Sequence, residues 1–102
     1  MDREQALSIA RAFIELARAS GYRVHDAFLF GSVVRGSAGP DSDIDIALVL
    51  EDIMNSFDAQ VELMKLRRRI DTRIEPHAFI ADAECYSDPF LKEVTKTGIR
   101  VT

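Results

Sequence analysis

Residues 28–50 read FLFGSVVRGSAGPDSDIDIALVL, and this stretch decides the fold that we expect. An apolar, strand-like segment over residues 23–30 runs directly into residues 31–42, which hold three of the five glycines. Such a mixture of glycine, serine and proline is typical of a loop, although about residues 32–36 could form a short helix. Residues 43–50 then alternate in character, as a half-buried strand does. We therefore expect two strands joined by a glycine-rich loop.

The strand expected over residues 43–50 has acids on one face. That face holds Asp43, Asp45, Ala47 and Val49, and the other holds Ile44, Ile46, Leu48 and Leu50. The carboxylates of Asp43 and Asp45 would project about 6–7 Å apart along the strand. Two such charges repel each other unless a cation or water lies between them. Because Mg²⁺ prefers carboxylate and phosphate oxygens, the pair indicates a magnesium site, the alternative being a solvated polar strand face.

The loop that precedes these acids has the features of a phosphate-binding turn. Glycine at position 31 lets the backbone approach a phosphate closely, and the N-terminus of a short helix would add an anion site. The Ser32 hydroxyl can donate a hydrogen bond to a phosphate oxygen. Arg35 lies near enough in sequence to add charge and a forked set of donors. In isolation, Gly31-Ser32 is more simply a plain turn, so the indication depends on the acids that follow.

The remaining sequence predicts helices and strands around this centre. The expected helices span residues 3–19, 56–70 and 88–97, and the further expected strands span residues 73–80 and 99–101. The stripe that the first helix should bury comprises Ala6, Ile9, Ala10, Phe13, Leu16 and Ala17, with Ala59, Leu63, Leu66 and Ile70 in the second. Phe13, Phe79 and Phe90 are expected in the core.

The strand expected over residues 73–80 should lie at an edge or carry an irregularity, because Pro76 cannot donate a ladder hydrogen bond. Its alternation places Arg73, Glu75 and His77 on one face. The fold class that follows is α/β (α+β): a small mixed β-sheet with helices packed on one face.

Composition limits the class of protein. The chain has 102 residues, a common size for one domain, so we expect a single domain over residues 1–102. The net charge of −4 argues against a broad nucleic-acid-binding surface. Cys85 is the one cysteine, which excludes an intrachain disulfide, and the polar N-terminus does not resemble a signal peptide. No apolar run approaches the roughly 20 residues of a membrane helix. We therefore expect a cytoplasmic protein.

Together, these motifs resemble those of a known family. Phe30-Gly31-Ser32, ten further residues and then Asp43-Ile44-Asp45-Ile46 are similar to the signature of the DNA polymerase β-type nucleotidyltransferase superfamily. The string from Gly31 to Gly36, followed by Ser42-Asp43-Ile44-Asp45, resembles the minimal nucleotidyltransferase branch, which includes antitoxin-like proteins. The resemblance implies a polymerase β-like nucleotidyltransferase core.

The resemblance also implies roles for individual residues. The expected nucleotide-binding residues are Gly31, Ser32, Arg35 and Ser42. Asp43 and Asp45 would bind Mg²⁺, and a two-metal site is compatible with the family. A third acid on a neighbouring strand would complete the metal-binding and catalytic set, where the superfamily more often has aspartate. We choose Glu75 because it lies within the strand pattern, whereas Asp71 lies at the preceding turn.

The function implied is Mg²⁺-dependent transfer of a nucleoside monophosphate, AMP from ATP, to a hydroxyl of a partner protein. Small members of this family often pair with a helical protein of the HEPN fold, so a co-encoded HEPN-type partner and an antitoxin role are expected. No membrane or nucleic-acid partner is expected. The alternative is a partner-binding module with a vestigial nucleotide site. The presence of Ser32, Asp43, Asp45 and a third acid favours the enzyme.

Overall fold

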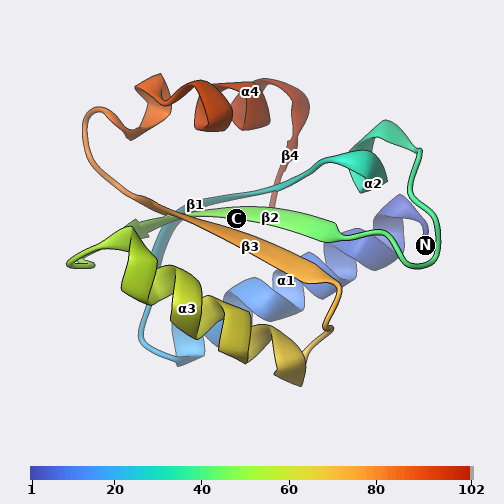
Figure 1. Ribbon diagram of the computed structural model, residues 1–102, viewed down its shortest axis with the longest axis horizontal. Helices are drawn as coiled ribbons and strands as arrows, with labels where there is room; N and C mark the ends of the chain where they lie inside the picture. The colour runs from blue at the N-terminus through green and yellow to red at the C-terminus, as the bar shows by residue number, and fades with distance from the viewer. Residues whose placement is uncertain (102) are drawn as a thin grey trace.

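In the computed structural model, which describes residues 1–101, four helices and two short 3₁₀ turns surround one sheet (Figure 1). The strands are β1 (Arg23–Phe30), β2 (Ile44–Glu51), β3 (Ile74–Ile80) and β4 (Ile99–Arg100). The helices are α1 (Arg3–Ala19), α2 (Ser32–Arg35), α3 (Ser56–Leu66) and α4 (Pro89–Thr97), and the 3₁₀ turns are η1 (Arg67–Arg69) and η2 (Cys85–Ser87). The strand order is β3-β2-β1-β4, with β2 and β3 parallel and the other pairs antiparallel. The predicted mixed sheet is therefore confirmed.

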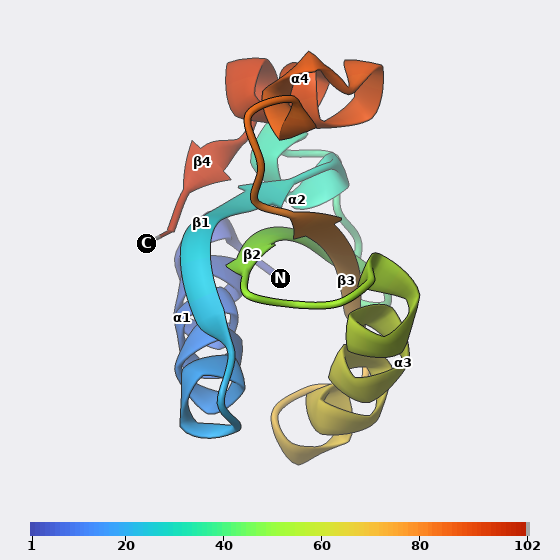
Figure 2. The ribbon, with the colours of Figure 1, turned by 90° about the vertical axis from the view of Figure 1, so that its left-hand side faces the viewer.

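Helices lie on both faces of this sheet (Figure 2). α1 and α3 cover the face that holds the main core, whose largest members include Phe13, Ile14, Ile46, Leu48 and Leu63. α4 lies on the opposite face, where a second cluster comprises Phe28, Ala47, Val49, Leu91 and Val94. The expectation of helices on one face holds for α1 and α3 and is wrong for α4. The reason is that the acid-bearing face of β2 becomes apolar after Asp45 and needs its own cover.

The long helices follow the predicted ranges with small changes in their buried faces. Ile9 and Leu16 were predicted to be buried in α1 but are only partly covered. Leu7 and Ile14, which were not in the predicted stripe, are buried instead. The second helix is shorter than expected, because α3 ends at Leu66 and a 3₁₀ turn follows, leaving Ile70 exposed. Within residues 1–101, no helix combines the length and the apolar character needed to cross a membrane.

β3 is an edge strand, as its proline predicted, and side chains from α3 and η1 occupy its outer edge. The Gln60 amide donates to Pro76 O at 2.5 Å and accepts from the Ala78 N–H at 2.9 Å, as a neighbouring strand would. Arg67 donates to Ile74 O at 2.9 Å. These bonds satisfy backbone groups that an edge strand otherwise leaves open, and they attach β3 to α3 and η1.

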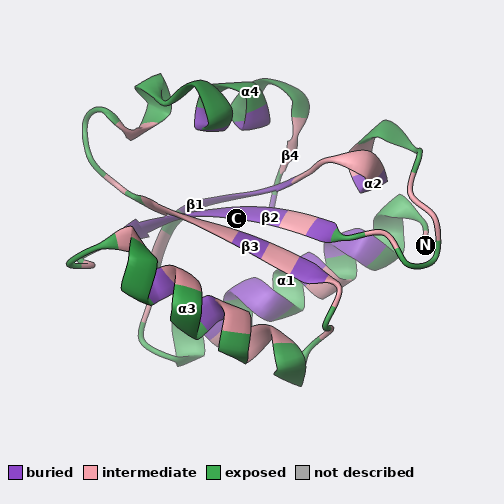
Figure 3. Ribbon diagram, viewed as in Figure 1, coloured by how far each residue is buried: buried purple, intermediate pink, exposed green. Residues whose placement is uncertain are grey.

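Along the central strand β2, every residue is buried except Asp45 and the last residue, Glu51, which are half-buried (Figure 3). Asp43, immediately before the strand, is exposed, and Asp45 is half-buried. The residues from Ile46 to Leu50 are fully buried. The end of β2 that holds the two acids is therefore the part of the central strand that solvent and ligands can reach.

Candidate active site

Gly31 brings the loop after β1 into direct contact with Asp45. Phe30 is the register partner of Asp45 in the antiparallel β1–β2 pair, so the next residue passes beside that carboxylate. Gly31 has φ 84° and ψ −152°, a backbone region adopted almost only by glycine. A Cβ at position 31 would lie 2.5 Å from Asp45 Oδ2. Glycine is therefore required for the backbone conformation, and a side chain at this position would displace the Asp45 carboxylate. The loop predicted to bind phosphate and the acid predicted to bind metal lie side by side.

The short helix α2 begins at this contact. Gly31 O accepts hydrogen bonds from the N–H groups of Val34 and Arg35 at 3.1 and 3.2 Å. The first N–H groups of a helix have no acceptor within it, so those of Ser32 and Val33 are available at the end that adjoins Asp45. At the other end, Arg3 donates to Val34 O at 2.6 Å and anchors α2 to the start of α1.

Two further predicted nucleotide ligands lie at different places around the loop. Arg35, the last residue of α2, is exposed and lines a groove between α2 and α4. The Ser42 hydroxyl accepts a hydrogen bond from the Gly39 N–H at 2.8 Å, and the Ser42 N–H donates to Gly39 O at 3.2 Å. Ser42 thus shapes the turn that leads into β2, and its hydroxyl proton is still available to a ligand.

The predicted acids come from two adjoining strands. Asp45 and Glu75 are register partners in the parallel β2–β3 pair, so they project from the same face of the sheet. Neighbouring strands lie about 4.8 Å apart, which places the bases of the two side chains side by side. Asp43 precedes Asp45 by two residues, at the exposed entry to β2.

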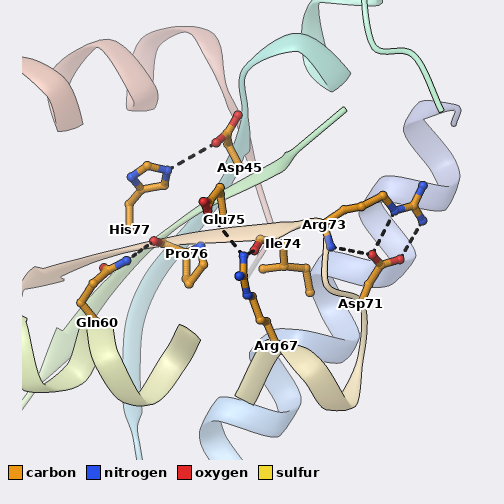
Figure 4. Close-up of polar contacts among 9 residues, drawn as sticks. All are labelled: Asp45, Gln60, Arg67, Asp71, Arg73, Ile74, Glu75, Pro76 and His77. Carbon is orange, nitrogen blue, oxygen red and sulfur yellow. Dashed lines mark hydrogen bonds and ion pairs between the residues drawn. The ribbon is translucent and has the colours of Figure 1, made fainter. Parts of the chain in front are cut away.

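The carboxylates of Asp45 and Glu75 contact different partners (Figure 4). Asp45 Oδ1 lies 3.4 Å from His77 Nε2. Glu75 Oε2 lies 3.6 Å from a terminal guanidinium nitrogen of Arg67, the same nitrogen that donates to Ile74 O. Among residues 1–101, no three His, Cys, Asp or Glu side chains are gathered closely enough to form a metal-binding cluster. The Glu75 carboxylate lies toward Arg67, and the three predicted acids do not form such a cluster.

The donor set nevertheless suits Mg²⁺ in its usual mode of binding. This ion is commonly held by one or two carboxylates together with substrate phosphates. Asp45 offers a half-exposed carboxylate against the phosphate loop, and Asp43 offers an exposed one. These two residues would hold the ion.

Asp71, the alternative third acid, is bound by a different arginine. Arg73 holds it through Nε at 3.0 Å, a terminal nitrogen at 2.7 Å and its own N–H at 2.9 Å. The hydrogen bond from the Arg73 side chain lowers the pKa of Asp71. Arg73 also donates to Pro40 O at 3.0 Å, which ties the loop to this turn. Asp71 is therefore a weak proton acceptor with a structural role.

The position of Arg73 corrects the predicted strand face. Arg73 was expected beside Glu75 and His77, but β3 begins one residue later, at Ile74. Its guanidinium turns to Asp71 and points away from Asp45 and His77 (Figure 4).

Aromatic rings border the acids. The rings of His77, Phe30 and Phe90 form a triangle, in which the centroid of His77 lies 5.1 Å from Phe30 and 5.4 Å from Phe90. Phe79 stacks on Phe90 at 6.0 Å. Phe90 was expected in the core and is instead 46% exposed. Alternation along β3 places His77 and Phe79 on the site's face. No local signal could have located Phe90 there, because the face on which α4 packs is set by tertiary structure.

Gly31→Ala is expected to lower both stability and ATP affinity. The strained backbone alone costs on the order of 1–3 kcal/mol, and the new methyl group would displace the Asp45 carboxylate. Gly36→Ala is the matched control, because Gly36 also has a positive φ (78°) but a Cβ there meets nothing within 4 Å. Thermal unfolding and calorimetric ATP titration would measure both variants. Equal ATP affinity in the two variants would contradict a functional contact between Gly31 and Asp45.

Both the sequence and the fold match known proteins. The family model described as "Polymerase beta, Nucleotidyltransferase" matches residues 14–102. The crystal structure of a protein described as a "putative nucleotidyltransferase" from Sulfolobus solfataricus is similar to this chain, with a TM-score of 0.63 and 25% sequence identity. The match covers 96% of this chain and 80% of that chain. No curated protein matches the sequence significantly.

Proposed function

The chain belongs to the polymerase beta nucleotidyltransferase family, and from that premise we propose that it transfers AMP from ATP to a hydroxyl of a partner protein. The observation that supports this most is the contact between Gly31 and Asp45, where a Cβ would lie 2.5 Å from the carboxylate. It brings the proposed phosphate-binding loop against one of the two acids proposed to bind the metal.

The proposed reaction assigns a task to each group. The triphosphate lies against Gly31, Ser32 and the first N–H groups of α2, with Arg35 adding positive charge. Asp43 and Asp45 hold Mg²⁺, which when bound neutralises the charge that develops on the phosphate oxygens.

Glu75 accepts the proton of the acceptor hydroxyl. The hydroxyl oxygen then bonds to the α-phosphorus, the bond from that phosphorus to its bridging oxygen breaks, and pyrophosphate leaves. Glu75 is suited to this step because it is the register partner of Asp45 and its side chain is 36% exposed.

The surroundings of the acids support a large acceptor. Asp43 is exposed, and β3, which holds Glu75, is an edge strand. α4 packs over Ala47 and Val49, deeper along the sheet than Asp43 and Asp45. Transfer to a hydroxyl competes with transfer to water, so the open side needs a cover during reaction. We propose that a docked protein supplies both the cover and a tyrosine, serine or threonine, with a co-encoded HEPN-type protein as the partner of an antitoxin.

Labelled ATP tests this proposal directly. Incubating the chain and its co-encoded partner with labelled ATP and Mg²⁺ should add AMP to the partner, and mass spectrometry should locate it on a hydroxyl side chain. Asp45→Asn should abolish the labelling. A stable complex with no adduct would instead support the alternative, a partner-binding module. The ion pair between Arg67 and Glu75 favours that alternative. Rapid labelling of a small-molecule hydroxyl with the partner untouched would contradict both.

A further inference from the structure

A groove beside the phosphate loop lies between α2 and α4. Its volume is about 290 Å³. Phe30 and Gly31 line it at the end of β1, Arg35 lines it from α2, and Phe90, Glu93 and Thr97 line it from α4. Gly31 thus belongs both to the groove and to the contact with Asp45. Whatever occupies the groove adjoins the proposed position of the triphosphate.

We propose that this groove binds the base and sugar of the nucleotide whose triphosphate lies at Gly31 and Ser32. The inference rests on the proposed function and adds to it the determinant of nucleotide specificity. The volume of the groove is at the lower end of the range for small-molecule sites, which suits one nucleoside better than a protein segment.

Phe90 provides a stacking surface for a planar ring. It is 46% exposed although it is a large apolar side chain. Contacts fix its orientation: Phe30 packs edge-on at 5.5 Å, and the rings of His77 and Phe79 lie 5.4 and 6.0 Å away. An aromatic ring held in place but left uncovered can stack on a base of any kind.

The charged residues of the groove indicate how a bound nucleotide would be oriented. Arg35, on α2, suits the phosphates, which lie at the Gly31 end. Glu93, on α4, offers a carboxylate that can only accept hydrogen bonds. A base with an amino group can donate to it, as adenine does through its 6-amino group. The groove is therefore expected to prefer ATP to the same triphosphate lacking that amino group.

Two threonines of α4 allow a matched test. Thr95 and Thr97 are both exposed, and each hydroxyl donates to a carbonyl of its own helix at 2.9 Å. Only Thr97 lines the groove. Thr97→Trp should fill the groove and weaken ATP binding by roughly tenfold or more, the scale of losing base stacking. Thr95→Trp should leave ATP affinity unchanged.

Inorganic tripolyphosphate separates this proposal from the proposed function. With Mg²⁺, it should bind equally to wild type, Thr97→Trp and Thr95→Trp, because it has no base. Asp45-dependent binding of ATP and tripolyphosphate with no effect of Thr97→Trp on ATP would overturn the groove assignment alone. Failure of wild type to bind either ligand would overturn the triphosphate site and this proposal with it. If the Thr97→Trp variant modified the partner more slowly than wild type but bound ATP with the same affinity, the groove would instead be assigned to binding of the acceptor protein.

A second variant guards against misfolding of the tryptophan variant. Glu93→Ala replaces an exposed helical side chain with the best helix former. It should remove the preference for ATP over purine riboside triphosphate, which lacks the 6-amino group, while tripolyphosphate binding stays the same. A preference retained in Glu93→Ala would contradict the proposed orientation of the base.

Discussion

Asp45→Asn is expected to remove the Mg²⁺ dependence of ATP binding and to reduce AMP transfer by at least about 10³-fold, because metal stabilisation of transition-state charge contributes several kcal/mol. Asparagine keeps the size of the side chain, so the contact with Gly31 is preserved and only the charge is lost. Asp43→Asn should act in the same direction. Calorimetric titration of ATP with and without magnesium chloride measures binding, and labelling of the partner measures transfer.

Asp41→Asn is the matched control for this experiment. Asp41 lies two residues before Asp43, is exposed, and belongs to the turn that precedes β2. Its replacement removes the same charge from the same segment. ATP affinity should change little, because Asp41 is not one of the proposed metal ligands. Equal Mg²⁺ dependence in wild type, Asp43→Asn and Asp45→Asn would contradict a metal site built on the two carboxylates. An equal loss in Asp41→Asn would indicate a general effect of charge near the loop.

The order and type of the elements could be predicted because their signals are local. The loop over residues 31–42 and the alternation over residues 43–50 gave β1, α2 and β2 to within a residue of the observed bounds. Pro76 correctly predicted an edge strand, since the constraint of proline acts on its own backbone. The close approach of Gly31 to Asp45 follows from the register of two adjacent strands.

Features that depend on long side chains could not be predicted in the same way. Arg67 lies eight residues before Glu75, and nothing in that spacing shows that η1 brings the guanidinium to the edge of β3. Arg73 has the alternation of a strand residue but contacts Asp71 and the loop instead. The nucleotide, metal and catalytic roles of the candidate residues remain predictions.

The choice between the two candidate third acids now has a physical basis. Asp71 is held by three hydrogen bonds from Arg73, which lower its pKa and make it a poor acceptor for a proton. Glu75 has a single contact with Arg67, at 3.6 Å, which a bound substrate could displace at small cost. Glu75 also projects beside Asp45, whereas Asp71 lies in the turn before β3.

Glu75→Gln is therefore expected to leave ATP affinity nearly unchanged and to slow AMP transfer by about 10²–10⁴-fold, the usual effect of removing a general base. Glutamine keeps the side-chain length but cannot take the proton of the acceptor hydroxyl. Asp71→Asn should slow transfer much less, and its main effect should be lower thermal stability as Arg73 loses its partner. Single-turnover transfer to the partner, with ATP affinity measured in parallel, separates the two effects. A larger loss of transfer in Asp71→Asn than in Glu75→Gln would assign the proton-accepting role to Asp71. A loss of the Mg²⁺ dependence of ATP binding in Glu75→Gln would identify Glu75 as a metal ligand and not only a proton acceptor.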